Sequence, residues 1–312
     1  MLKKRNADRQ VKVSVCVVTY NQEKYIRQCI QSLVDQEADF DFEVIVADDY
    51  STDGTRQIVL EFANNYPELV KPVFHEKNIG ALKNFVFVHN LAEGEYIAHM
   101  DGDDYALPGK LKTQVDYLNS HPECNIVWHR VYIMNDASGK MAEDLIDYGR
   151  LPKSGFNRAD ILRFITIGMN SSKMYRSSVK GFDLPRFPVV DYFMNVEQIG
   201  SGVARFVGDV PLGVYRAGIG IASSGNTTRV LLRNSFLYFS EKYPEYKRDI
   251  CAAALVLFFA AFKNRKWSNC ILFAGVVVKV IRMGAFLDIW RDRAIIGMLR
   301  IPNSVKQSVV KK

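Results

Sequence analysis

The chain of 312 residues is 48% hydrophobic and 24% charged, and its formal net charge at pH 7 is +7. This composition excludes fibrous repeats and disorder, and the length suits one large α/β domain with a smaller appended unit. Residues 227–312 contain sixteen Lys and Arg against five Asp and Glu, so a basic tail follows a mildly acidic body.

Strands and helices are predicted to alternate over the first hundred residues. Valine-rich apolar runs such as VKVSVCVVTY are typical of strands covered on both faces, and apolar residues three and four apart mark one helix face. The predicted strands cover 11–20, 42–47, 71–75 and 96–100, and the predicted helices cover 23–37, 55–65 and 84–91. This alternation predicts a doubly wound, mostly parallel sheet with right-handed crossovers, whose ligands bind beyond the carboxyl ends of the strands.

The second half of the chain is less regular. Its predicted elements are a helix at 108–120, a strand at 125–134, an irregular loop region at 137–158 over the site, helices at 160–167 and 192–200, and a strand pattern at 204–215. From Thr228 onward the chain is predicted to be a helical extension.

Polar clusters follow three of the predicted strands: TYN at 19–21, DDYS at 48–51 and DGDD at 101–104. A parallel sheet brings such strand ends to one edge, where five aspartates repel one another unless a cation is present. Asp101 and Asp103, two apart in a turn, suit one Mg2+ or Mn2+, because these ions prefer oxygen ligands. We therefore predict a divalent cation at this edge.

Other interpretations of these clusters are weaker. An isolated DxDD is also common in turns and helix caps. A calcium loop requires a closing glutamate at position 12, and Lys112 stands there. No glycine-rich phosphate loop follows the first strand, so a bound nucleotide's phosphate is expected to be neutralised by metal.

Four motifs in this order, VSVCVVTYNQEKYIRQCIQSLVDQ, FEVIVADDYSTDGT, NIG and GEYIAHMDGDD, resemble the donor half of the family-2 glycosyltransferases of GT-A fold. The resemblance is close over residues 11–135 and looser over 155–225. It implies an α/β, Rossmann-like architecture with an N-terminal tail (1–10), a GT-A domain (11–226, with a nucleotide-sugar half at 11–135 and an acceptor half at 136–226) and a basic helical C-terminal extension (227–312).

The resemblance also implies an activity: inverting transfer of a sugar from a nucleotide-diphosphate sugar, most often a UDP-sugar, with Mn2+ or Mg2+. The acceptor would be a hydroxyl of a glycan or lipid-linked glycan in cell-surface polysaccharide synthesis. The implied nucleotide-binding residues are Thr19, Tyr20, Asn21, Asp49, Ser51 and Asp101, the metal ligands are Asp101 and Asp103, and the supporting residues are Asp104 and Arg216. Within this set, the Tyr20 ring would stack on the base and the Asp49 carboxylate would accept the uracil imide N–H.

An inverting transferase needs a base that removes the acceptor proton. The resemblance suggests Asp191, at the start of a predicted helix that is followed by a strand and the pair Tyr215-Arg216. Glu197 is a rival six residues on, and Asp191 could instead be an N-cap. Asn21 likewise could be a helix N-cap, which is compatible with a binding role.

Two departures from the family pattern affect the site. Tyr50 stands where the family usually has glycine, so the turn there is expected to differ. A histidine often follows the YR pair, but here the sequence continues AGIGIASS. Its contact with diphosphate or metal is then missing, or is supplied by Arg216 or Ser223.

The tail contains two apolar stretches, 250–262 and 270–278, each shorter than the roughly 18–20 residues that span a bilayer. They are predicted to form a helix pair. Either the pair packs on the catalytic domain, or it docks on a membrane surface with Lys263, Arg265, Lys266 and Trp267 at the headgroups, which would suit a polyprenyl-linked acceptor.

The sequence also predicts the cellular compartment, and it leaves two rival functions to be considered. The five cysteines lack CxxC spacing and are predicted to be buried free thiols of a reducing compartment. No signal-peptide segment is seen, so a cytoplasmic protein is predicted, either free or peripheral on the cytoplasmic face of the membrane, with no nucleic acid as partner. The rivals are a metal-dependent nucleotidyltransferase, which normally needs a glycine-rich basic loop, and a non-catalytic protein that binds membrane or nucleic acid through its basic tail.

Overall fold

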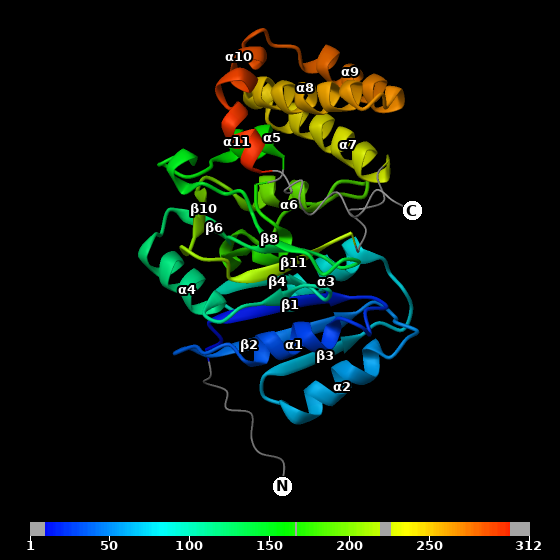
Figure 1. Cartoon of the computed structure of the whole chain (residues 1–312), viewed down its shortest axis with the longest axis vertical. Coiled ribbons are helices and arrows are strands. Elements are labelled where there is room, and N and C mark those ends of the chain that lie inside the picture. Colours follow the sequence, from blue (N-terminus) through cyan, green and yellow to red (C-terminus); the bar gives the residue numbers. More distant parts are fainter. Residues whose placement is uncertain (1–9, 166, 219–225, 300–312) are drawn as a thin grey trace.

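A computed structural model describes residues 10–165, 167–218 and 226–299 of the chain. Nearly all of the predicted N-terminal tail (1–10), together with Ser223 and residues 300–312, lies outside these ranges. The protein is elongated, with the α/β sheet at its middle and one end and a group of helices at the other end (Figure 1).

The larger sheet has seven strands in the order β10-β6-β9-β4-β1-β2-β3. They are β1 (Val13–Thr19), β2 (Phe42–Asp48), β3 (Val70–Phe74), β4 (Tyr96–Asp101), β6 (Cys124–His129), β9 (Met174–Arg176) and β10 (Val203–Val207). Only β9 runs antiparallel to its neighbours among these described strands. The predicted mostly parallel sheet is therefore confirmed. Its register pairs Thr19 with Asp48 and Val18 with Asp101, which brings the ends of β1, β2 and β4 to one edge.

Helices cover both faces of this sheet. They are α1 (Ile26–Val34), α2 (Thr55–Asn65), α3 (Ala81–Leu91), α4 (Lys110–Ser120), α5 (Arg158–Phe164) and α6 (Asp191–Gln198). Side chains alternate along β1, so Val15 and Val17 pack in one core with α1, α2 and α4, while Cys16 packs in a second core with α3, α5 and α6. The two cores confirm the doubly wound arrangement.

A second sheet corrects three predictions. It contains β5 (Tyr105–Ala106), β11 (Gly213–Ala217), β7 (Tyr132–Asn135) and β8 (Met141–Glu143), in the order β5-β11-β7-β8. The prediction of a single strand at 125–134 is wrong, because this segment contains β6 and β7, which belong to different sheets. The prediction of one strand at 204–215 is wrong for the same reason, because β10 and β11 belong to different sheets. The segment 137–158 is not wholly irregular, since β8 pairs with β7. An apolar pattern does not reveal such a change of sheet when both pieces are buried, although Gly208 at φ +79° marks the second break.

Up to residue 299, the C-terminal extension contains five α-helices, α7 (Asn226–Lys242), α8 (Lys247–Lys263), α9 (Trp267–Val280), α10 (Gly284–Arg291) and α11 (Arg293–Met298). Phe236, Phe239 and Phe273 of this extension share one hydrophobic core with Phe156 and Phe193 of the α/β body. The predicted packing of the tail on the rest of the protein is therefore present. Arg163 of α5 adds ion pairs at 3.1 Å to Asp249 and to Asp292.

The cysteines and the length of the apolar helices can be compared with expectation in the same described ranges. All five cysteines are buried and free, as predicted. Among the helices described, none is both long enough and apolar enough to cross a bilayer.

Gly94, at the turn into β4, tests the packing of this sheet. A Cβ at Gly94 would lie 2.5 Å from the Ser14 backbone nitrogen and 2.8 Å from the Tyr96 carbonyl oxygen. Because backbone atoms of central strands cannot move aside cheaply, Gly94→Ala is expected to lower the free energy of unfolding by about 1–3 kcal/mol in chemical denaturation. The control is Gly275→Ala in α9, where a Cβ meets nothing within 4 Å and alanine should be neutral or stabilising. Equal stability of Gly94→Ala and the parent protein would contradict the described packing.

Candidate active site

The loops that follow β1, β2 and β4 are joined through their backbones. The Asp49 N–H donates to the Thr19 carbonyl at 3.0 Å, and the Gly102 N–H donates to the Val18 carbonyl at 2.9 Å. A Cβ at Gly102 would lie 2.5 Å from the Gln22 side-chain oxygen and 3.0 Å from the Val18 carbonyl oxygen, so the residue between the two aspartates of DGDD is closely surrounded. The structure therefore brings the three predicted polar clusters together.

Asn21 and Ser51 hold the first two loops against each other. The Asn21 N–H donates to the Ser51 hydroxyl at 2.8 Å, and the Asn21 side-chain oxygen accepts the Thr52 N–H at 2.8 Å. Asn21 is not the N-cap of α1, because that helix begins at Ile26 and its N-cap is Tyr25. The alternative of a capping asparagine is therefore wrong, and the side chain instead sets the shape of the loops.

Two non-glycine residues of these loops have left-handed backbones, Asn21 with φ +51° and Tyr50 with φ +65°. The expectation that the turn differs at Tyr50 is thus wrong in its backbone, since Tyr50 adopts the conformation that glycine favours. Such conformations in non-glycine residues concentrate at functional sites. The rings of Tyr20 and Tyr50 are 47% and 44% exposed, which leaves them available to stack on a planar ligand.

Asp49 is buried and is held by the NIG motif. Its two carboxylate oxygens accept the Ile79 N–H at 2.7 Å and the Gly80 N–H at 2.9 Å, and the Asn78 amide donates to its carbonyl at 3.1 Å. Each oxygen keeps a second lone pair, so Asp49 can still accept from a ligand. Asp48 has a different role, because its carboxylate accepts the Ser51 N–H and pairs with Arg56 inside the protein.

Asp101 lies at the end of a buried row of hydrogen bonds. Its carboxylate contacts the His99 ring at 3.1 Å, His99 contacts His89 at 3.0 Å, and His89 contacts the Tyr175 hydroxyl at 2.6 Å. The second oxygen of Asp101 accepts from the Ser171 hydroxyl at 3.3 Å. Burial opposes ionisation, but the contacts from His99 and Ser171 hold the pKa of Asp101 below its ordinary value. Burial also lowers the pKa of both histidines, which favours neutral rings.

Asp103 and Asp104 ionise less readily. Burial and the charge of Asp101 raise the pKa of Asp103 to about 6, and burial with the charges of Asp101 and Asp103 raises the pKa of Asp104 well above its ordinary value. One Asp104 oxygen accepts the Arg216 N–H at 2.8 Å, whereas the other is buried without a partner among the described residues. The mutual repulsion predicted for these aspartates is therefore present.

These side chains fit a divalent cation. Asp103 supplies carboxylate oxygens, the ligands that Mg2+ and Mn2+ prefer, and a bound cation would favour its ionised form. Within the described residues, no group of three or more His, Cys, Asp or Glu could hold a metal ion. A cation here would need further ligands from water or from a phosphate.

Two buried lysines lie beside the aspartates. The Lys110 ammonium donates to the Ser171 carbonyl, and the Lys173 ammonium donates to Asn195 at 3.1 Å and to Gln198 at 3.2 Å. Burial lowers the pKa of each lysine to about 8, while nearby aspartates, including Asp101 in both cases, oppose that shift. The sequence did not predict these internal cations, because an isolated lysine in a helix or short strand normally indicates a solvated surface.

Asp191 is the first residue of α6, and the N-cap of that helix is Val190, so the N-cap alternative for Asp191 is wrong. Its side chain is accessible to solvent. Desolvation by the surrounding protein nevertheless raises the pKa of its carboxyl, against the charge of Lys173, and the charge of Asp101 adds to the rise. Its rival Glu197 instead pairs with Lys242 at 2.7 Å and accepts from Tyr243 of the helical extension at 3.1 Å.

Tyr215 connects the two groups of acidic residues. Burial raises the pKa of its hydroxyl, and the charges that add to this shift are those of Asp104, Asp101, Asp103 and Asp191. One side chain thus lies within electrostatic reach of the predicted base and of the whole DGDD cluster. The neighbouring Arg216 is fixed by Asp136 at 3.3 Å and by the Tyr25 ring at 5.1 Å.

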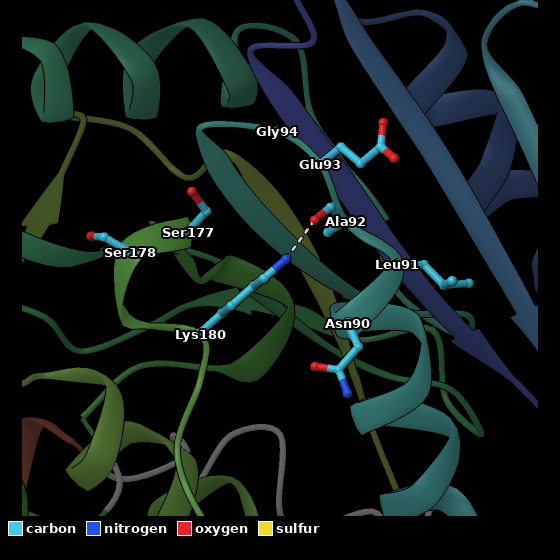
Figure 2. Close-up of a pocket in the computed structure, with 8 residues that line it drawn as sticks. All are labelled: Asn90, Leu91, Ala92, Glu93, Gly94, Ser177, Ser178 and Lys180. Carbon is cyan, nitrogen blue, oxygen red and sulfur yellow. Dashed lines mark hydrogen bonds between the residues drawn. The ribbon is translucent and has the colours of Figure 1, made fainter.

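A hollow of about 560 Å³ lies elsewhere in the structure (Figure 2). Residues 90–94 line it together with Ser177, Ser178 and Lys180, whose ammonium donates to the Ala92 carbonyl at 2.8 Å. Gly94 precedes β4, so this hollow lies at the opposite edge of the sheet from Asp101, and none of the predicted site residues lines it. The chemistry favours the edge with the aspartates.

Known proteins resemble this chain over the same region. The sequence profile described as Glycosyl transferase family 2 matches residues 14–179. The uncharacterized protein Rv1520 of Mycobacterium tuberculosis is 34% identical over 209 residues, which are 65% of this chain and 58% of that protein. The chain thus spans 58% of the length of this relative.

Two solved structures share the fold. The crystal structure of Staphylococcus aureus TarS 1–349 in complex with UDP-GlcNAc has a TM-score of 0.66 at 20% identity, over 97% of this chain and 93% of that one. The mannosyltransferase PcManGT from Pyrobaculum calidifontis, in complex with GDP-Man and Mn2+, has a TM-score of 0.54 at 17% identity, over 96% of this chain and 87% of that one. At these identities the likeness concerns the fold, which agrees with the predicted GT-A architecture.

Proposed function

Because this chain belongs to glycosyl transferase family 2, we propose that it is a metal-dependent, inverting glycosyltransferase that uses a nucleotide-diphosphate sugar, most often a UDP-sugar. The observation that carries the proposal is the meeting of the loops after β1, β2 and β4 at one edge of the sheet, which brings Asp49 to the DGDD cluster. The charge of Asp191 acts on the Tyr215 hydroxyl together with the charges of that cluster. The acceptor would be a hydroxyl of a glycan or of a polyprenyl-linked glycan in cell-surface polysaccharide synthesis. Such an acceptor would place the enzyme in the cytoplasm, at the cytoplasmic face of a membrane.

The donor would bind across the loops after β1 and β2. The exposed Tyr20 ring offers a face for the base, and Thr19, Asn21 and Ser51 shape the loop beneath it. The free lone pairs of Asp49 suit the imide N–H of uracil. This arrangement favours a uridine nucleotide, as in the TarS complex with UDP-GlcNAc.

Sugar transfer would require a base and a means of releasing the diphosphate. Asp191 would take the proton of the acceptor hydroxyl while the oxygen bonds to the anomeric carbon from the face opposite the leaving group. The bond from that carbon to the diphosphate breaks, and the nucleoside diphosphate leaves with the electron pair. Asp103, with Asp101 beside it, would hold a divalent cation, whose positive charge would stabilise the departing diphosphate. Arg216 and Asp104 would hold the loop shape around this point.

A nucleotidyltransferase is the second candidate, and the loop after β1 argues against it. That loop contains no glycine-rich basic segment, and its Asn21 is tied to Ser51 through the backbone N–H and to Thr52 through the side-chain oxygen. A non-catalytic binding protein is also less well supported, because it gives no reason for Asp103 to be kept at a raised pKa beside Asp101.

Ligand-dependent thermal stabilisation tests the donor assignment. A panel with UDP-GlcNAc, other UDP-sugars and GDP-mannose, each with Mn2+ or with EDTA, should contain one compound that raises Tm only with Mn2+. At a concentration of 100 Kd, such a ligand adds about 2.7 kcal/mol of stability. A matched incubation with nucleoside triphosphates and sugar phosphates should release no pyrophosphate. Pyrophosphate release without stabilisation by any nucleotide sugar would favour the nucleotidyltransferase.

A further inference from the structure

Helices α8, α9 and α10 expose a set of large apolar side chains at the end of the molecule remote from α2 and β3 (Figure 1). We call this set the outer face; its members, 48% to 81% exposed, are Phe259, Phe262, Trp267, Ile271, Val278, Ile281, Met283, Phe286, Leu287 and Trp290. Two of the three tryptophans of the chain are among them. The opposite sides of the same helices are buried in the core, so the outer face is not needed for packing within the chain.

The charges around the outer face have one sign. Six exposed cations accompany the apolar side chains: Lys263, Arg265, Lys266, Lys279, Arg282 and Arg293. Within 263–293 the acidic residues are Asp288 and Asp292, which are 2% and 7% exposed. Asp288 pairs with Arg248, and Asp292 pairs with Arg163 and Arg291. In this part of the described chain, all carboxylates are withdrawn and paired, while the six cations have no ion pair.

We propose that the outer face docks on the surface of a bilayer that contains anionic lipid. Exposed apolar side chains beside lysine and arginine suit the boundary between headgroups and acyl chains, where tryptophan is also favoured. Cations near an anionic membrane surface add attraction that depends on salt. Since no described helix can cross a bilayer, the helices lie on the membrane rather than through it.

Other occupants fit the outer face less well. A second copy of the chain docked symmetrically would bring the two sets of six cations together without a carboxylate between them, which is unfavourable. Nucleic acid would meet the cations, but aliphatic side chains such as Ile271, Val278 and Leu287 do not stack on bases. Anionic lipid satisfies the charges and the apolar side chains together.

The placement of the outer face agrees with the proposed acceptor. Helix α6, which begins at Asp191, lies between the sheet and the helical extension (Figure 1). If the proposed function holds, docking puts the acceptor half on the membrane side and the donor loops farther away. Membrane docking itself does not require catalysis, so it is tested separately from the proposed function.

Co-sedimentation of the full chain with vesicles tests the proposal. Vesicles of phosphatidylcholine with phosphatidylglycerol should bind the protein, and binding should weaken as salt rises. Lys263→Glu/Lys266→Glu and Ile271→Gln/Val278→Gln should each weaken binding at least about tenfold. The matched controls are Lys83→Glu/Lys153→Glu and Leu60→Gln/Val210→Gln, which change exposed residues of the same kinds elsewhere and should bind like the parent protein.

Three outcomes would overturn docking on anionic lipid. The first is no binding to these vesicles, and the second is equal binding to pure phosphatidylcholine. The third is equal loss of binding in the control variants. Analytical sedimentation without vesicles tests whether a second copy of the chain covers the outer face instead. A dimer of the parent protein that dissociates in the outer-face variants, together with no lipid binding, would assign the face to a second copy. Nucleotide-sugar stabilisation of every variant, measured in solution, reports on the proposed function independently.

Discussion

Replacement of Asp191 by asparagine is expected to lower kcat by about 10²–10⁴-fold, the contribution of a general base, with little change in donor KM. Asparagine keeps the size of the side chain but cannot accept the acceptor proton. The helix start should be retained, because the Asp191 oxygen that accepts the Tyr192 N–H at 2.9 Å has an amide counterpart in asparagine. The measurement is single-turnover transfer from the donor identified by the thermal panel.

The pH profile adds a second readout for Asp191. The surrounding protein raises the pKa of this carboxyl, so the ionised base should be lost at a higher pH than for an ordinary aspartate. Activity of the parent enzyme should therefore rise with pH through that raised pKa. In Asp191→Asn the residual activity should not show this rise with pH, a difference that a purely structural role would not produce.

Glu197→Gln is the matched control for the rival base. Glu197 is bound to Lys242 and Tyr243 of the helical extension, so its loss should lower stability and leave kcat within a few-fold of the parent value. The opposite result, a large loss of kcat in Glu197→Gln with nearly full activity in Asp191→Asn, would move the base to Glu197.

The strands and their polar ends could be predicted because each is a local pattern. Valine-rich runs, followed by aspartate or asparagine, indicate buried parallel strands whose ends carry function. The NIG motif was identified only by family resemblance, and the structure supplies its reason, since all three of its residues contact Asp49. The exchange of strands between two sheets after His129 could not be predicted, because burial continues across the break.

The electrostatics of the site depend on contacts between distant parts of the chain, which the sequence does not reveal. His99 and His89 are ten residues apart, and Lys110 reaches Ser171 from 61 positions away. The only sequence signal was His99 itself, a histidine inside the apolar strand YIAHMD. The aspartates that the sequence predicts to repel one another unless a cation is present thus have internal lysines and histidines as partial partners. We therefore expect the chain to fold without metal, with Asp103 at a raised pKa.

Replacement of Asp103 by asparagine should abolish metal-dependent transfer and yet stabilise the metal-free protein. The folded-state pKa of Asp103 is about 6, above the ordinary 3.8, so the folded chain holds this proton more tightly than the unfolded chain. The free energy of unfolding then falls as pH rises from about 4 to about 6 and stays lower above that range. The asparagine side chain carries no charge at any pH, so at pH 7.5 in EDTA the Asp103→Asn variant should gain at most about 3 kcal/mol.

When metal and nucleotide sugar are present, the parent protein should become more stable than Asp103→Asn. With Mn2+ and nucleotide sugar, the parent protein should gain stability and turn over, whereas Asp103→Asn should do neither and should lose at least about 10²-fold in kcat. Asp209→Asn, which removes an exposed carboxylate from the turn between β10 and β11, is the control and should follow the parent protein in both buffers. If Asp103→Asn gained as much stability from Mn2+ as the parent protein, the cation would lie elsewhere. If the proposed function holds, the raised pKa and the metal requirement have one origin, because the carboxylate that is costly to ionise alone is the one that a bound cation would stabilise.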